Sequence, residues 1–261
     1  MILLQTLILG MIQGVTEFLP VSSSGHLVLI QTLFGLKEML FYDVLLHFAT
    51  LLAVILFFYK DIIGYFKNLK IIFYIIVLTI PTGVIGVIVK KYFSFVFDNV
   101  LISGICLVIT GLWMWIAETV YTKNVKEKIK IYNIGILKAL LIGVVQGISV
   151  LPGISRSGST LGSALIMNID KLQAVKFIFI SSIPAIFGAT FLELKEVAEG
   201  TVMFQPSYIY GMITAFIFAI FSLKFLIKIV SKQKLRYFSY YCWTVGLISI
   251  LSYIFVNMSK R

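Results

Sequence analysis

Long apolar runs separated by short polar connections follow one another along most of the chain. Six of these runs come close to the roughly 20 residues that a helix needs to cross a hydrocarbon core ~30 Å thick. They lie at about 41–59, 71–89, 99–118, 174–192, 208–230 and 237–257. A helix satisfies its backbone hydrogen bonds within its own segment, as a lipid environment requires. The pattern predicts an all-α polytopic membrane protein with six full spans.

Two segments, residues 1–40 and 136–170, depart from this pattern. Each holds two apolar stretches interrupted by a centre rich in Gly, Ser and Pro, and each stretch is short for a full crossing. We expect each segment to form a re-entrant helical hairpin, which enters the membrane and returns to the same face. Two short helices that both cross the membrane are the alternative for each segment.

Composition and charge refine this picture. The 261 residues are 60% hydrophobic and carry a net charge of +11, but the cations lie in the connections between apolar runs, where membrane topology places them. This distribution argues against a nucleic-acid partner. Cys106 and Cys242 sit inside apolar runs and are interpreted as small buried residues without a disulfide.

The connections fall into two sets of different charge. One set has fifteen cations and three acids (Lys60, Lys67, Lys70, Lys123, Lys126, Lys128, Lys130, Lys138, Lys171, Lys176, Lys224, Lys228, Lys232, Lys234 and Arg236, with Asp61, Glu127 and Asp170). The other set has six of each (Lys37, Lys90, Lys91, Lys195, Lys260 and Arg261, with Glu38, Asp43, Asp98, Glu193, Glu196 and Glu199). The positive-inside rule makes the first set cytoplasmic and puts both termini outside. The two hairpins then enter from opposite faces.

The two unusual segments also resemble each other. Gly10-Met-Ile-Gln13-Gly14 matches Gly143-Val-Val-Gln146-Gly147 at an offset of 133, and Ser22, Ser24 and Gly25 recur at the same offset. Each hairpin precedes three spans, an odd number, so the second half is predicted to be inverted. We expect one membrane domain with repeats at 1–135 and 136–261 and a site where the repeats meet. The Gly-xxx-Gly pairs predict close helix packing.

The first motif runs from Gln13 to His26. Gln13 and Glu17 are four residues apart and therefore project from one face of a helix. Pro20 is expected to end that helix, and the following serines to cap a second one whose first turn holds His26. An intramembrane carboxylate is costly and usually faces a functional cavity, although an interfacial helix-end carboxylate is the alternative. His47, within an apolar span, is interpreted as structural.

The second motif is the segment from Pro152 to Thr160. Its small residues allow backbone N–H groups to form an anion-binding nest, and a helix starting near Ser157 would aim its positive end at the same point. Arg156 adds a planar guanidinium that matches phosphate oxygens bidentately. A membrane-edge cation, or an ion-pair partner of Glu17, is the alternative for Arg156.

These two motifs, in this order, resemble the signatures of the undecaprenyl-diphosphatase family, also called the bacitracin-resistance family. The family pattern is Glu or Gln, three residues, Glu, then Ser-Ser-x-Gly-His, with a separate Pro-Gly-x-Ser-Arg-Ser segment, and Gln13 is the permitted alternative to Glu. The resemblance implies an inner (plasma) membrane enzyme that hydrolyses undecaprenyl diphosphate to the monophosphate carrier of cell-wall synthesis. It also implies a divalent cation and an active site open to the outer, or periplasmic, side.

Roles for the motif residues follow from this chemistry. Arg156 with Ser155, Ser157 and Thr160 would bind the terminal phosphate. Glu17 with Gln13 would hold Mg²⁺ or Ca²⁺ through oxygen atoms. His26 would be a base or itself the nucleophile. Ser23, three residues earlier, could share a hydrogen bond with His26 and form a phosphoserine, or His26 could activate water.

A transporter or flippase for an anionic prenyl-phosphate lipid is the competing function, because inverted repeats with broken helices also build transporters. Phosphate release by protein in detergent separates the two. A membrane scaffold, the third alternative, leaves the polar motifs unexplained. The polyprenyl diphosphate and membrane lipids are the expected partners, and small residues within the spans would permit a homodimer.

Overall fold

The computed structural model describes residues 3–36, 39–97, 99–124, 126–198, 204–232 and 234–258. In these residues the chain forms helices and connecting turns. The long helices are α3 (Leu40–Phe57), α5 (Leu69–Tyr92), α6 (Val100–Lys123), α9 (Lys171–Ala198), α10 (Ser207–Ser231) and α11 (Arg236–Met258). The shorter ones are α1 (Leu3–Thr16), α2 (Ser23–Leu33), α4 (Tyr59–Phe66), α7 (Ile136–Ile148) and α8 (Arg156–Ile166), with 3₁₀ turns at Ser94–Val96 and Ile131–Asn133.

The six long helices confirm the six predicted spans. Each contains a stretch that is long and apolar enough to cross a membrane, and together these stretches correspond to the six runs seen in the sequence. The chain is therefore a multi-pass membrane protein.

Helix α4 was not predicted. The helix of the run at 41–59 ends at Phe57, and a separate short helix follows. An ion pair of 2.7 Å between Asp61 and Lys176 connects α4 to α9.

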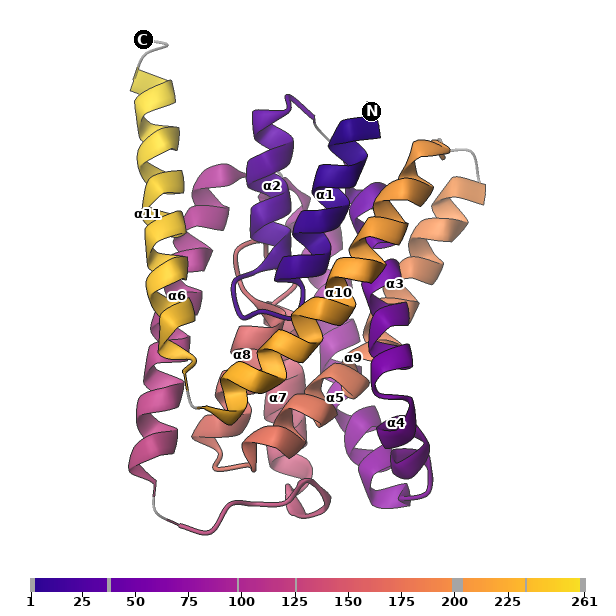
Figure 1. Ribbon diagram of the computed structural model, residues 1–261, viewed down its shortest axis with the longest axis vertical. Coiled ribbons are helices and arrows are strands. Elements are labelled where there is room, and N and C mark those ends of the chain that lie inside the picture. Colours follow the sequence, from indigo (N-terminus) through magenta and orange to yellow (C-terminus); the bar gives the residue numbers. More distant parts are fainter. Residues whose placement is uncertain are drawn as a thin grey trace.

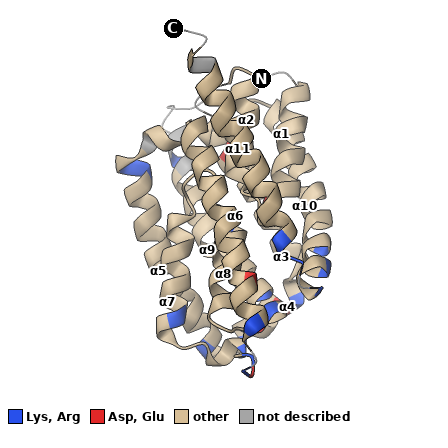
Figure 2. Ribbon diagram, turned by 90° about the vertical axis from the view of Figure 1, so that its left-hand side faces the viewer, with Lys and Arg blue, Asp and Glu red and all other residues tan. Residues whose placement is uncertain are grey.

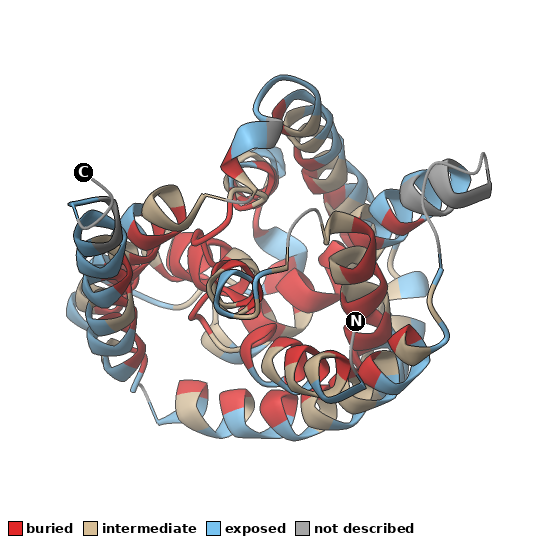
Figure 3. Cartoon of the chain, turned by 90° about the horizontal axis from the view of Figure 1, so that it is seen from above, coloured by how far each residue is buried: buried red, intermediate tan, exposed pale blue. Residues whose placement is uncertain are grey.

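The outward surfaces of the spans are apolar. Large side chains such as Ile80, Phe221 and Leu251 are more than 60% exposed, and Figure 3 shows buried residues gathered between the helices and exposed residues on their outer faces. A soluble monomer rarely leaves such continuous apolar surface open to water. Lipid is the environment that this surface fits.

Two helical hairpins, α1–α2 and α7–α8, pack among the spans, with α2 and α8 largely buried and α1 and α7 exposed on one face. Figure 1 shows the first in the upper half of the molecule and the second in the lower half. Their first helices pack tightly on spans: a Cβ added to Gly10 would collide with the carbonyl of Gly211 in α10, and one added to Gly143 with the carbonyl of Leu78 in α5. The close packing predicted from the Gly-xxx-Gly pairs is confirmed.

Lysine and arginine gather at the lower end of the molecule (Figure 2), where α3, α6, α8 and α10 end. Here Glu118 of α6 accepts the backbone N–H of Arg236, the first residue of α11, at 2.5 Å. The Arg236 guanidinium lies over Trp115 and donates to Thr119. Because the first N–H groups of a helix lack partners within it, Glu118 caps α11 and joins it to α6.

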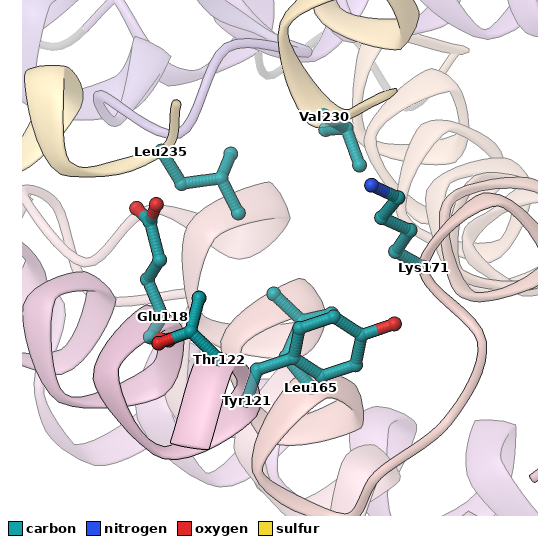
Figure 4. Close-up of a pocket in the computed structure, with 7 residues that line it drawn as sticks. All are labelled: Glu118, Tyr121, Thr122, Leu165, Lys171, Val230 and Leu235. Atoms are coloured by element: carbon teal, nitrogen blue, oxygen red, sulfur yellow. The ribbon is translucent and has the colours of Figure 1, made fainter. Parts of the chain in front are cut away.

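A small cavity lies beside this cap and is drawn in Figure 4. Its lining is largely apolar, with Glu118 and Lys171 as its charged groups (Glu118, Tyr121, Thr122, Leu165, Lys171, Val230 and Leu235). Both charged groups already bind protein atoms, Glu118 at Arg236 and Lys171 at the Ser231 carbonyl. The cavity is thus part of the packing between α6, α8, α9 and α10, and the sequence motifs lie elsewhere.

Candidate active site

The turns of the two hairpins touch each other between the spans. Ser157, at the start of α8, donates a 2.9 Å hydrogen bond to the carbonyl of Leu19 in the first turn. Gly25 faces Gly153 so closely that a Cβ on Gly25 would lie 3.0 Å from the Gly153 Cα. Motifs that are about 130 residues apart in the sequence therefore share one location.

The first turn folds as its residues predict. Helix α1 ends at Thr16, just ahead of Pro20, and the Glu17 N–H still donates to the Gln13 carbonyl at 2.9 Å. Ser22 adopts the left-handed region with φ 64° and caps α2 by accepting the Gly25 N–H. This conformation is unusual for a residue with a Cβ, and such residues cluster at functional sites. His26 lies in the first turn of α2, as expected.

Glu17 is the centre of a buried polar cluster. Its Oε2 accepts hydrogen bonds from Gln13 Nε2 at 3.0 Å and from Ser23 Oγ at 2.6 Å. The Arg156 guanidinium lies 3.5 Å from Oε1, which links the two motifs by charge. The Glu17 side chain is 6% exposed and that of Arg156 is 28% exposed. The carboxylate is therefore enclosed, whereas the guanidinium is partly exposed.

His47 joins this cluster from α3. Its Nδ1 lies 3.1 Å from Glu17 Oε2 and 2.9 Å from Gln13 Nε2. The interpretation of His47 as a purely structural residue was therefore incomplete. The signal that could have identified it was present: a histidine in the middle of an apolar span is as costly as the carboxylate of the first motif.

The second motif forms a capped helix start. Gly153 has φ 92°, which suits glycine, and its carbonyl accepts a hydrogen bond from Thr110 of α6. Thr110 in turn accepts the Ser155 N–H at 3.0 Å, and the Ser155 hydroxyl accepts the Gly158 N–H. Helix α8 begins at Arg156, one residue before the predicted start. The N-terminus of α8 and the Arg156 guanidinium therefore lie next to each other, because Arg156 is the first residue of the helix.

The hydroxyls of this motif already bind protein atoms. Ser155 bonds Ser157 at 3.1 Å, Ser157 donates to Leu19, and Thr160 donates to the Arg156 carbonyl at 2.6 Å. All three residues are at most 3% exposed. In this arrangement Arg156 is the exposed member of the predicted phosphate-binding group, and the hydroxyls hold its position.

His26 and Ser23 have different partners. His26 Nδ1 lies 2.7 Å from the Ser22 carbonyl and Nε2 lies 2.8 Å from the hydroxyl of Tyr241 in α11. Ser23 has one proton, which it donates to Glu17. The Ser23–His26 hydrogen bond considered as one alternative is replaced by these contacts, because the turn places Ser23 toward Glu17 and His26 toward α11. Tyr241 lay outside both motifs and gave no signal in the sequence.

Comparison with known proteins agrees with the motif evidence. The family model for bacitracin resistance protein BacA matches residues 6–248, nearly the whole chain. The chain belongs to the BacA family. An undecaprenyl-diphosphatase of Halothermothrix orenii is 41% identical over 95% of this chain and 96% of its own length. Proteins of the same name from Alkaliphilus metalliredigens and Methanococcus vannielii are 42% and 39% identical, each over 95% of this chain and 97% and 99% of their own. The resemblance drawn from the two motifs is confirmed.

The buried polar cluster around Glu17 offers oxygen atoms that fit a hard divalent cation. Gln13 is fully buried, and its Oε1 has no hydrogen-bond partner among the described residues, which is unusual for a buried polar atom. Beside it stand the Glu17 carboxylate and the His47 imidazole. In the described part of the chain no three His, Cys, Asp or Glu side chains group together as a complete metal cage. Mg²⁺ commonly binds through one or two carboxylates, with substrate phosphates and water supplying the remaining ligands.

Proposed function

We propose that this BacA-family protein hydrolyses undecaprenyl diphosphate to undecaprenyl phosphate and inorganic phosphate. This reaction recycles the lipid carrier of cell-wall synthesis and opposes bacitracin. The observation that carries the proposal is the meeting of Glu17 and Arg156, 3.5 Å apart, at the contact of two hairpin turns inside the membrane. Relatives about 40% identical over nearly the full chain bear the name undecaprenyl-diphosphatase.

Arg156 anchors the terminal phosphate. Its side chain is partly open, unlike Glu17, and it stands at the first position of α8. Arg156 and Ser157 are the first two residues of α8, so their backbone N–H groups have no acceptor within the helix, and helix starts of this kind bind anions. Ser155, Ser157 and Thr160 keep this helix start in place and supply further hydroxyls. Charge that develops on phosphate oxygens in the transition state is stabilised here.

Glu17 and Gln13, with His47 beside them, would hold a divalent cation such as Mg²⁺ or Ca²⁺. When bound, that cation supplies positive charge that neutralises the diphosphate. Ser23 and His47 orient the Glu17 carboxylate through contacts of 2.6 and 3.1 Å. Supporting contacts of this kind normally tune metal affinity.

His26 acts as the proton acceptor. A water oxygen attacks the terminal phosphorus, His26 takes the water proton, and the phosphoanhydride bond breaks with its electrons going to undecaprenyl phosphate. If Ser23 attacks first, its proton passes to Glu17, which already accepts it at 2.6 Å, and His26 activates the water that frees the phosphoserine. Ser23→Ala separates the routes: retained turnover identifies water, and loss with intact metal binding identifies Ser23.

The inverted repeat supports a site between the two halves. Helix α1 of the first half packs on α10 of the second, α7 of the second packs on α5 of the first, and the third spans α6 and α11 pair with each other. This exchange is the pairing expected of two halves related by a two-fold axis in the membrane plane. The hairpins are then re-entrant from opposite faces, within one domain of repeats 1–135 and 136–261.

The cation-rich end, by the positive-inside rule, faces the cytoplasm. The opposite end, where α1 begins and α11 ends (Figure 1), faces the outer side of the inner membrane, and the active site opens there. Labelling of single cysteines placed at Tyr92 and at Lys228 with an impermeant reagent in intact cells tests this orientation: Tyr92→Cys should react and Lys228→Cys should not. The homodimer permitted by small residues in the spans stays a prediction.

The test of function is inorganic phosphate release from a C55 prenyl diphosphate by purified protein in detergent, with and without EDTA. We expect metal-dependent release that is lost in His26→Ala and Arg156→Ala. Because transport needs a sealed membrane and hydrolysis does not, release in detergent excludes a protein that only transports. A folded wild-type protein that releases no phosphate, while it moves the lipid across liposomes, would overturn the proposal.

A further inference from the structure

The two ring nitrogens of His26 have partners with different hydrogen-bonding abilities. Nδ1 lies 2.7 Å from the Ser22 carbonyl oxygen, which can only accept. Nδ1 must therefore carry the ring proton in the neutral imidazole. Nε2 is left with its lone pair, and it lies 2.8 Å from the Tyr241 hydroxyl, which can donate to it. Both contacts select the same tautomer.

The ring contact adds a second constraint. The His26 and Tyr241 rings are nearly parallel, with 9° between their planes and 5.6 Å between their centres. The Ser22 carbonyl is turned toward His26 by the left-handed backbone of Ser22, with φ 64°, and accepts the His26 backbone N–H as well at 3.2 Å. His26 is thus held from α2 on one side and from α11 on the other.

We propose that Tyr241 is a positioning residue for His26, which fixes the ring plane and keeps the Nε2 lone pair aimed at the open side of the site. The inference rests on the proposed function, in which His26 accepts a proton. The Tyr241 hydroxyl marks the place that the reacting water takes at Nε2, and the ring contact keeps the imidazole oriented after that exchange. Tyr241 is 44% exposed, so its hydroxyl is free to move away.

This role explains why a residue from the last span belongs to the site. His26 lies in the first turn of α2, directly after the hairpin turn, and its ring faces Tyr241 of α11. Without that contact the ring would be free to turn and Nε2 would no longer point in one direction. An imidazole held in one tautomer and one plane has less reorganisation to undergo during proton transfer. Tyr241 is therefore expected to affect kcat more than KM.

The chain has two histidines, which makes a direct test practical. In protein labelled with ¹⁵N in its imidazoles, His47→Gln assigns the two rings. We expect the His26 Nδ1 resonance to be that of a protonated nitrogen and the Nε2 resonance that of an unprotonated, hydrogen-bonded one. In Tyr241→Phe, which keeps the ring and loses the hydroxyl, Nε2 should move toward the position of a free unprotonated nitrogen.

The matched control is Tyr240→Phe, because Tyr240 packs on Trp115 and Trp243 on another face of α11. Because the reacting water replaces the Tyr241 hydroxyl at Nε2, we expect Tyr241→Phe, which keeps the ring contact, to shift the His26 resonances and to leave kcat close to that of wild type. Tyr241→Leu, which removes the ring contact that orients the imidazole, should lower kcat about five- to tenfold, the effect of one aromatic pair, with KM little changed. Tyr240→Phe should match wild type in His26 shifts, and Tyr240→Leu should match it in kcat.

The readouts separate the two proposals. Unchanged His26 nitrogen shifts in Tyr241→Phe, together with full kcat in Tyr241→Leu, would overturn the positioning role even if the protein is an active phosphatase. Conversely, a wild-type protein that releases no phosphate would remove the proposed function, while the nitrogen shifts would still report whether Tyr241 holds the His26 tautomer. A fall in kcat in Tyr241→Leu that is matched in Tyr240→Leu would also count against the proposal, since it would reflect general disturbance of α11.

Discussion

The two helical hairpins, α1–α2 and α7–α8, have similar helices and turns but different polar side chains. Gln13 and Gln146 occupy equivalent positions, are 0% and 1% exposed, and each has a side-chain oxygen without a partner among the described residues. Four residues later, however, the first hairpin has Glu17 and the second has Val150. The position of Ser23 in the first hairpin is taken by Arg156 in the second (156 − 23 = 133). The two hairpins are thus built alike, but the acid lies in the first hairpin and the cation lies in the second.

The turns also differ in their strained residue. Ser22 carries the positive φ in the first turn, whereas its counterpart Ser155 is extended, with φ −71°, and Gly153 takes the left-handed conformation instead. In both turns the serine hydroxyl caps the following helix. The cap is therefore the shared element, and the left-handed residue is placed where each turn needs its carbonyl: toward His26 in the first, toward Thr110 in the second.

The largest effect should come from removing the cation of the second hairpin. Arg156→Ala should lower phosphate release about a hundred- to a thousandfold, the usual loss of a group that stabilises transition-state charge. Glu17 retains Gln13, Ser23 and His47 as partners, so the variant should fold. Arg156→Lys keeps the charge without the planar fork and should recover only part of the activity. Near-normal turnover of a well-expressed Arg156→Ala protein would contradict this role.

Exchanging the equivalent glutamines for glutamate should separate the two hairpins. Gln146 contacts Thr82, a neutral partner, at 3.4 Å, so Gln146→Glu buries an unpaired carboxylate. We expect it to lower the thermal midpoint in detergent, at a cost of about 3 kcal/mol. Gln13→Glu places a second carboxylate beside His47 and beside Glu17, whose own charge faces Arg156. It should fold and reach full activity at lower Mg²⁺ concentration, since it adds ligand charge. Equal destabilisation by both changes would show that the hairpins are electrostatically alike.

The glycine contacts should reveal what the hairpins share. Gly10→Ala and Gly143→Ala each force a Cβ onto a backbone carbonyl of the neighbouring span, and each should destabilise the protein by about 2 kcal/mol. Gly83→Ala is the control, because a Cβ at that position meets nothing within 4 Å. Thermal unfolding in detergent measures all three. A silent change at one of the two hairpin positions would mean that the halves do not pack in the same way.

A smaller effect is expected at His47, which contacts Gln13 and Glu17 of the first hairpin. His47→Gln leaves a polar group near Glu17, and His47→Leu removes it. We expect the metal concentration for half-maximal phosphate release to rise about tenfold in His47→Leu, as for groups that orient a metal ligand, and less in His47→Gln. Thr50→Val on the same helix, whose hydroxyl bonds only the His47 carbonyl among the described residues, is the control. Identical metal titrations for all variants would remove His47 from the site.

Much of the fold could be predicted from the sequence. The six spans, the two short hairpins, the capping role of Ser22 and the start of α8 within one residue all follow from apolar run length and from turn and cap residues. These features are local: a helix begins and ends because of residues within a few positions of its ends. Helix α4 was not predicted, because its residues continue the apolar run of α3 and the break at Phe58 has no proline or glycine to indicate it.

The candidate site, like the fold, could be predicted from the sequence only in part. The sequence alone determined that Gln13 and Glu17 share a helix face, that the chain has a cationic and an acidic motif, and that each motif interrupts a pair of short apolar stretches. Only the tertiary structure decided that His47 and Tyr241 join these motifs, that Ser23 bonds Glu17 in place of His26, and that the hydroxyls around Arg156 are already engaged. The physical reason is distance. Contacts within one helix turn follow from the fixed helical period. Contacts between helices depend on how each helix is rotated against its neighbour, and that rotation is set by close packing over the whole chain.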